Sequence, residues 1–401
     1  MARSSLWSRP AIEVYVLLAA GDLVWLGFVP LLPEFDRRLD LSGLEIGLLL
    51  STFAIAVGVA SLPAGIACGR WGAKRVVSGA ALLMVIGSLL QAAVSSYALV
   101  LSGRVLSGLG FGAVWVGGVA ILTTLVPPER RDRVTASTMV IAGVGIMIGP
   151  GLFGIVADAF GLAAPSIGAA VLLAFTLLSL VLAPEPADQP VEASSSPRAA
   201  LTAVRREPLF LIGLLAMAIP GFVNNGVNTI VPLDLDAAGI SASGSGLIFS
   251  LGAFLFLLVS LAITRRAERF ATPFGALAPC LLLGALLIVP ATSVRAAPLT
   301  GFLLARSPVS AVLFAIAVPL AMRGAARSGI AAAVAAATLN LCWSASAISA
   351  PLLAGLLLDV TTTRIIYALL SVVSFAGAGL LLVAGRRVSA LPEAVPLPRH
   401  G

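Results

Sequence analysis

The sequence has 401 residues, of which 59% are hydrophobic and only 11% are charged. A water-soluble domain carries roughly 25% charged residues, so this composition excludes a soluble globular protein and indicates a chain that folds in lipid. The formal net charge of +7 does not indicate nucleic-acid binding, because the basic residues form short clusters between apolar stretches, as they do in the loops of membrane proteins.

Twelve apolar stretches are each long enough for a transmembrane helix, which needs about 20 residues. They lie at 11–33, 44–66, 76–95, 98–124, 134–157, 164–183, 208–233, 244–264, 273–291, 297–321, 328–357 and 363–384. Many contain Gly or Pro, which membrane helices tolerate. The prediction is an all-α membrane protein of 12 transmembrane helices.

The basic residues predict the orientation of these helices. With both termini in the cytoplasm, 19 of the 25 Lys and Arg residues fall in cytoplasmic segments. Only Arg37, Arg38, Arg295 and Arg364 fall in external segments. This bias predicts a multi-pass protein of the cytoplasmic membrane with both termini inside.

A polar segment near the midpoint divides the chain into two related parts. Residues 184–207 are rich in Pro, Ser, Ala and charge, which predicts a cytoplasmic linker. It joins an expected six-helix bundle at 1–183 to a second one, with a short tail, at 208–401. Matching residues recur about 200 positions apart: Asp22 with Asn224, Arg70 with Arg269, Arg104 with Arg306, and Asp158 with Asp359. The halves are therefore predicted to be parallel pseudo-repeats, a recurring plan of transporters.

Three short motifs lie in the first half of the chain. The first is the loop after the second span, with Gly65, Arg70, Gly72, Lys74 and Arg75; Gly69 precedes Arg70, and the second half has Glu268 and Arg269 at the equivalent place. In the fourth span, Arg104 is followed by glycines at 108, 110 and 112. The fifth span carries Gly145, Gly149, Pro150 and Gly154, with Phe153 just before the last glycine.

With these motifs the chain resembles the major facilitator superfamily over essentially its whole length. The loop looks like the signature G-x-x-x-D-R-x-G-R-K, with Gly69 in place of the acid and Ala73 in place of the first base. The fifth-span motif looks like the antiporter motif G-x-x-x-G-P-x-x-G-G, with Phe153 in place of one glycine. The resemblance implies the major facilitator fold and transport by alternating access, and the antiporter motif implies drug efflux in exchange for protons.

Asp22 and Arg104 are the expected pair for proton coupling. Asp22 lies near the middle of the first span, where burial disfavours an ionised carboxylate and a nearby cation favours it. Arg104 lies at a compatible depth in the fourth span. Two interpretations stay open for each residue: Asp22 carries a proton or only pairs with Arg104, and Arg104 faces the cavity, as the resemblance implies, or only binds backbone carbonyls.

The second half offers candidates for contacts with the substrate. Arg306 is predicted to bond to Asn224, Asn225 or Asn228, to attract an anionic substrate, or to reach the membrane interface. The three asparagines suit either a water-filled cavity or bonds between helices. Trp25 and Trp115 are further candidates for the cavity wall. Asp234 and Asp236, at the outer end of the seventh span, are expected to be solvated.

The glycine motif and the basic loops have two interpretations each. Gly145, Gly149, Pro150 and Gly154 form a hinge or simply allow helices to pack closely. The loop residues latch the cytoplasmic ends together when the cavity opens outward, or they only fix the topology. The patterns DxxD and HxxxxD of membrane enzymes are absent, and His400 is the single histidine. The pattern GxxxxGK[ST] of nucleotide binding is absent as well.

The functional prediction is a secondary active transporter that acts as a monomer on a small molecule, by proton-coupled efflux. Uptake or exchange of an organic anion, using Arg104 and Arg306, is the alternative; a polytopic membrane enzyme is a remote one. No cofactor, metal ion or nucleic acid is expected, and the partners are substrate, protons and lipid.

Overall fold

The computed structural model of the chain describes residues 8–127, 131–183, 207–264, 267–330 and 332–389. These residues form helices and no β-strand, which confirms the all-α prediction. Eleven helices are long and apolar enough to cross a membrane, and the shorter apolar helix Leu277–Thr292 matches the predicted ninth span. The predicted linker lies outside the described residues apart from Glu207, and so does the tail beyond residue 389.

Each predicted span corresponds to one helix, or to one helix with short extensions. The first half consists of α1 (Arg9–Gly27), η1 (Val29–Leu31), α2 (Leu32–Leu39), α3 (Gly43–Trp71), α4 (Ala73–Gln91), α5 (Tyr97–Thr124), α6 (Arg131–Phe160) and α7 (Ala164–Leu182). The second half consists of α9 (Pro208–Ala237), α10 (Ala242–Thr264), α11 (Ala267–Phe270), α12 (Leu277–Thr292), α13 (Ala296–Arg327), α14 (Ala332–Leu358) and α15 (Thr363–Ser389).

Proline breaks the first span into three helical pieces. Pro30 lies in η1 and Pro33 in the first turn of α2. Proline cannot donate a backbone hydrogen bond, so it is tolerated in the first turn of a new helix but interrupts a continuous one. The short helix α2 lies at one end of the bundle and carries charged side chains there.

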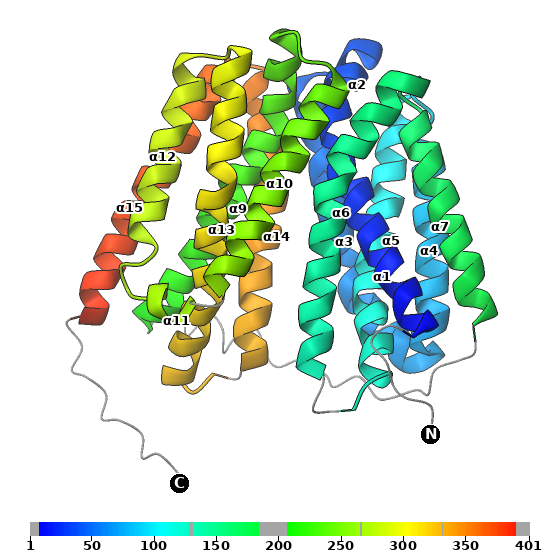
Figure 1. Cartoon of the computed structure of the whole chain (residues 1–401), viewed down its shortest axis with the longest axis horizontal. Helices are drawn as coiled ribbons and strands as arrows, with labels where there is room; N and C mark the ends of the chain where they lie inside the picture. The colour runs from blue at the N-terminus through cyan, green and yellow to red at the C-terminus, as the bar shows by residue number, and fades with distance from the viewer. Residues whose placement is uncertain (1–7, 128–130, 184–206, 265–266, 331, 390–401) are drawn as a thin grey trace.

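The two halves stand side by side, with the helices of α1–α7 on one side and those of α9–α15 on the other (Figure 1). The start of α1 and the end of α15 lie at the bottom of this view, and α2 lies at the top. We call the top the α2 end. Between the halves, α3 packs against α14 and α6 packs against α10. The predicted repeat interchanges these two pairs, because α3 corresponds to α10 and α6 to α14.

Glycines allow helices to approach until their backbones touch. In the first half, a Cβ atom on Gly145 of α6 would come within 3.0 Å of main-chain atoms of Ala19 in α1. Between the halves, Gly47 lies against the backbone of Pro351, and Gly154 lies against that of Ala242. Apolar side chains gain little by leaving lipid for another apolar surface, so such close contacts are a main source of helix association in membranes.

Gly145 therefore tests the importance of close packing in the first half. We expect Gly145→Ala to destabilise the protein by about 1–3 kcal/mol, because the methyl group would push α1 and α6 apart. Gly79→Ala is the matched control, since nothing lies within 4 Å of a Cβ atom there and alanine favours a helix over glycine. Thermal unfolding in detergent, monitored by tryptophan fluorescence, would measure the melting temperature of both variants. Equal melting temperatures would contradict a critical contact at Gly145.

Candidate functional site

Arg104 lies at the centre of the first half, fully buried in α5. Its Nε atom donates to the carbonyl oxygen of Leu49 in α3 at 2.8 Å, and its Nη1 atom donates to that of Val24 in α1 at 3.2 Å. The guanidinium carbon lies 4.6 Å from the centre of the Phe28 ring and 4.7 Å from that of Phe53. Only a planar, forked cation can bind two carbonyls and two ring faces at once. Arg104 thus ties α1, α3 and α5 together.

Asp22 is also buried but has no such partners. It lies in α1, 13 residues beyond Arg9, which is roughly 20 Å along the helix. It is 4% exposed, its Oδ2 atom has no hydrogen-bond partner, and the described residues place no cation within ion-pair distance of it. The pair of Asp22 with Arg104 that the sequence suggested is therefore not formed, because the carbonyls of Leu49 and Val24 take the guanidinium instead.

In the second half, Arg306 binds the residue that replaces Asp22 in the repeat. Its Nη1 atom donates to the side-chain oxygen of Asn224 at 2.9 Å, and Ser310 donates to the same oxygen at 3.1 Å. Arg306 is 6% exposed, so the structure shows the predicted bond to Asn224 and not a position at the membrane interface. Both arginines contact the first helix of their own half.

The other two asparagines of α9 are not bound to Arg306. Asn225 donates to the carbonyl oxygen of Gly221 in its own helix at 2.8 Å, while the side-chain oxygen of Asn228 has no partner. All three asparagines are half-buried. They keep some accessible surface that a substrate could contact.

A row of aromatic rings connects the halves near these residues. Trp343 of α14 meets Trp25 edge-on at 5.3 Å, Trp25 stacks on Phe53 at 6.2 Å, and the row continues through Phe111 to Trp115 at 5.8 and 6.2 Å. Trp25, Trp115 and Trp343 are half-buried. Sequence reasoning missed Trp343, because it has no aromatic counterpart in the repeat.

The antiporter-like motif in α6 has two separate contacts. Gly145 and Gly149 lie against the backbone of Ala19 and Leu23 in α1, three residues before and one residue after Asp22. The next residue, Pro150, touches Gly246 of α10, in the second half, with its backbone. The motif therefore links the helix that carries Asp22 to the contact between the halves. The structure supports close packing, and a hinge stays a prediction.

Phe153, where the motif has a glycine, is accommodated by a glycine on the neighbouring helix. Its ring is buried and occupies the space that a Cβ atom on Gly27 would need. The departure from the motif thus preserves the contact between α1 and α6.

Of the basic loop motif, Gly72 and Lys74 have defined structural roles within the first half. Gly72 has φ +84° and joins α3 to α4, a conformation that favours glycine. The Nζ atom of Lys74 donates to the carbonyl oxygens of Val181 and Ala183 at the end of α7. Arg70, Arg75 and Arg269 are exposed, Gly65 is half-buried, and the side chain of Glu268 lies outside the described part. A latch between the halves at this loop stays a prediction.

The expectation of a solvated Asp234 is wrong. Asp234 is 7% exposed and accepts hydrogen bonds of 2.8 Å from Thr363 and from the buried hydroxyl of Tyr367. These bonds join α9 to α15. Charge alone could not predict this, because one helical turn decides whether a side chain near a helix end faces solvent or a neighbouring helix.

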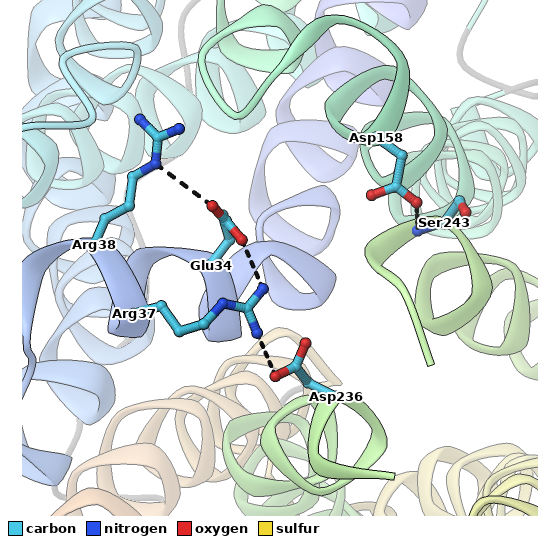
Figure 2. Close-up of polar contacts among 6 residues, drawn as sticks. All are labelled: Glu34, Arg37, Arg38, Asp158, Asp236 and Ser243. Atoms are coloured by element: carbon cyan, nitrogen blue, oxygen red, sulfur yellow. Dashed lines mark hydrogen bonds and ion pairs between the residues drawn. The ribbon is translucent and has the colours of Figure 1, made fainter. Parts of the chain in front are cut away.

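A cavity of about 270 Å³ lies between the halves at the α2 end. Residues of both halves line it, among them Glu34, Arg37, Arg38, Asp158, Asp236 and Ser245. Figure 2 shows Arg37 between Glu34 of its own helix and Asp236 of α9, with which it forms an ion pair across the halves. None of the residues predicted for the substrate or proton site lines this cavity.

Comparison with known proteins gives a match over most of the chain. The family model described as Major Facilitator Superfamily matches residues 14–347. Quinolone resistance protein NorA of Staphylococcus aureus is 25% identical over 178 residues, which are 43% of this chain and 46% of NorA. MFS-type transporter ppzB of Metarhizium rileyi is 30% identical over 180 residues, 43% of this chain and 37% of that protein. The matches thus span less than half the length of these relatives.

Solved structures share the fold over nearly the whole chain. A bacterial homologue of the human lysosomal transporter Spinster, in an inward-facing and unoccupied conformation, has a TM-score of 0.69 at 14% identity, covering 95% of this chain and 96% of that one. The nucleoside transporter NupG has a TM-score of 0.71 at 14% identity, covering 96% of this chain and 98% of its own.

The geometry at Arg104 predicts that lysine cannot replace it. We expect Arg104→Lys to lower the free energy of unfolding by about 1–3 kcal/mol, because an ammonium group cannot reach both carbonyls and both rings. Arg38→Lys is the control: that side chain is half exposed and lies 3.5 Å from Glu34, a distance at which little stability is at stake. Thermal unfolding in detergent would measure both variants. If both variants had the same melting temperature, Arg104 would not organise the first half.

Proposed function

This chain belongs to the Major Facilitator Superfamily and is a membrane transporter, not an enzyme, and from that premise we propose that it exports a small molecule in exchange for protons. The observation that carries the proposal is the carboxyl group of Asp22, buried in a transmembrane helix without a cation or a hydrogen-bond donor to its Oδ2 atom. An ionised carboxylate in that position costs several kcal/mol, whereas a protonated one costs much less. A group of this kind takes up a proton when it is enclosed and releases it when water reaches it.

The surroundings of Asp22 suit coupling to the motion of the halves. Gly145 and Gly149 hold α1 on either side of Asp22, and the adjacent Pro150 touches α10 of the second half. A movement between α6 and α10 would therefore change the packing around Asp22. Arg104, fixed by Leu49 and Val24, would supply a constant positive field nearby.

Similarity supports the direction of transport. Part of the chain is similar to a quinolone resistance protein, and export of a compound is one way to confer resistance to it. For the substrate route we propose Trp25, Trp115 and Trp343 together with Asn224, Asn225 and Asn228, which combine apolar rings with amide groups and are all half-buried. This composition suits a small, partly apolar molecule.

The distribution of Lys and Arg supports an orientation with both termini in the cytoplasm. The α2 end would then face the outside, so the contacts between halves there would close the external side. We propose that the chain alternates between this conformation and one that is closed at the other end, by rocking of the halves, and that it works as a monomer in the cytoplasmic membrane.

Transport of an organic anion receives less support from the geometry. Arg104 is fully buried and Arg306 is 6% exposed, and both already bind groups of the protein. Competition by anionic compounds that is lost in Arg306→Ala would favour this alternative.

The role of Asp22 is testable in cells. We expect Asp22→Asn to abolish the efflux that a proton gradient drives while the protein still folds, because asparagine is similar in size but cannot carry a proton. The measurement is accumulation of a panel of amphiphilic compounds in cells with and without the protein, with and without a protonophore. Asp40→Asn, at an exposed position, controls for loss of an acid. If Asp22→Asn pumps like the wild type against a gradient, Asp22 is not the coupling site.

A further inference from the structure

Two carboxylates connect the halves at the α2 end, each reaching from one half to a helix of the other. Asp158, in the last turn of α6, accepts a hydrogen bond of 2.9 Å from the backbone N–H of Ser243, in the first turn of α10 (Figure 2). Asp359, directly after α14, accepts bonds from the N–H groups of Gly43 and Leu44, at 2.6 and 3.0 Å. The acceptors lie at the ends of spans 5 and 11, and the donors lie at the starts of spans 8 and 2.

The start of α3 shows why the contact with Asp359 matters. The first N–H groups of a helix have no partner within the helix. In α3, Glu45 accepts from the backbone N–H of Ser42, and the hydroxyl of Ser42 accepts from that of Glu45. The two N–H groups between them, those of Gly43 and Leu44, are bound by Asp359. The second half thus completes the cap of a helix in the first half.

The two contacts occupy corresponding positions of the repeat. Asp158 and Asp359 are 201 residues apart, and the donors Gly43 and Ser243 are 200 residues apart. Close backbone contacts bring both carboxylates into reach: Gly43 lies against Gly355, and Gly154 lies against Ala242. A negative charge at a helix start is stabilised by the helix dipole as well as by the hydrogen bonds.

Both contacts exist only while the halves are together at this end. Separation would leave the carboxylates and the N–H groups to water, so the contacts favour one conformation and contribute nothing to the other. The ion pair of Arg37 with Asp236 crosses the same boundary, but these side chains are 55% and 33% exposed, and exposed ion pairs contribute little.

We infer that Asp158 and Asp359 are positioning residues of the transport cycle, which set the ratio between the conformation closed at the α2 end and the one open there. The inference rests on the alternating access of the proposed function, but not on protons or on a particular substrate. Either carboxylate alone shifts the ratio modestly, and both together define how often this end opens.

The cysteine variant Ser245→Cys provides a reporter of opening. Ser245 lines the cavity between the halves, is 3% exposed, and its hydroxyl has no hydrogen-bond partner, so the replacement removes no bond. The reporter is placed in a background in which Cys68, Cys280 and Cys342 are replaced by alanine or serine. The rate at which a bulky maleimide labels it in purified protein, without substrate or proton gradient, is proportional to the population open at this end.

We expect Asp158→Asn and Asp359→Asn each to raise the labelling rate about two- to fivefold, the range of a surface charge at a helix terminus. The double variant should be about tenfold faster, because contacts that share no residue act additively in free energy. Asp40→Asn is the matched control: it removes an acid at the same end, and asparagine tolerates the left-handed conformation that Asp40 adopts at φ 50°. Asp158→Glu, which keeps the charge, should restore part of the slow rate.

A second measurement tests the same contacts in the protein that keeps both Asp158 and Asp359. Raising the salt concentration from about 0.05 to 1 M screens exposed charges and should speed labelling of the reporter protein with both carboxylates more than that of the double variant. The inference is overturned if the double variant labels at the rate of Asp40→Asn, or if salt does not change the labelling rate of the reporter protein with both carboxylates. If the labelling rates change as expected but the protein with both carboxylates shows no proton-coupled efflux, the result would count against the proposed function alone.

Discussion

A polar group within the bilayer has to find its partner inside the protein, and this constraint arranges the centre of the molecule. Arg104 meets it with two backbone carbonyls and two aromatic rings drawn from three helices. Arg306 meets it with Asn224 in the second half. Because these bonds hold the two guanidinium groups in place, each half has a fixed polar centre around which its helices pack.

Asp22 is the exception that gives this centre a possible function. Its repeat partner Asn224 is bound by an arginine, whereas Asp22 itself has neither an arginine nor a donor to its Oδ2 atom. The guanidinium group of Arg104 binds the carbonyl oxygens of Leu49 and Val24 and does not pair with Asp22. The halves therefore differ chemically at the same place: a fixed hydrogen-bonded pair in one, and in the other a carboxyl group whose stability depends on whether water reaches it.

The sequence was sufficient for the helices and for the symmetry between the halves, because both depend on patterns along the chain. Apolar length predicted the twelve helices, and the spacing of Arg104 and Arg306 predicted their similar places. Contacts that depend on the rotation of one helix against another were not predictable: the absence of an Asp22–Arg104 pair, the burial of Asp234 against Tyr367, and the contact of Trp343 with Trp25. Asp158 and Asp359 were recognised as repeat partners, but only the structure shows that each binds a helix of the opposite half.

The central claim, that compounds leave in exchange for protons, is tested most directly by proton flux. In everted membrane vesicles that hold an acid interior, a pH-sensitive fluorescent dye reports the gradient while a compound excluded by expressing cells is added. The account predicts that the compound partly collapses the gradient in vesicles with the protein, and that vesicles without it show no change. Uptake of the compound by the vesicles with no change in the gradient would contradict the exchange of substrate for protons.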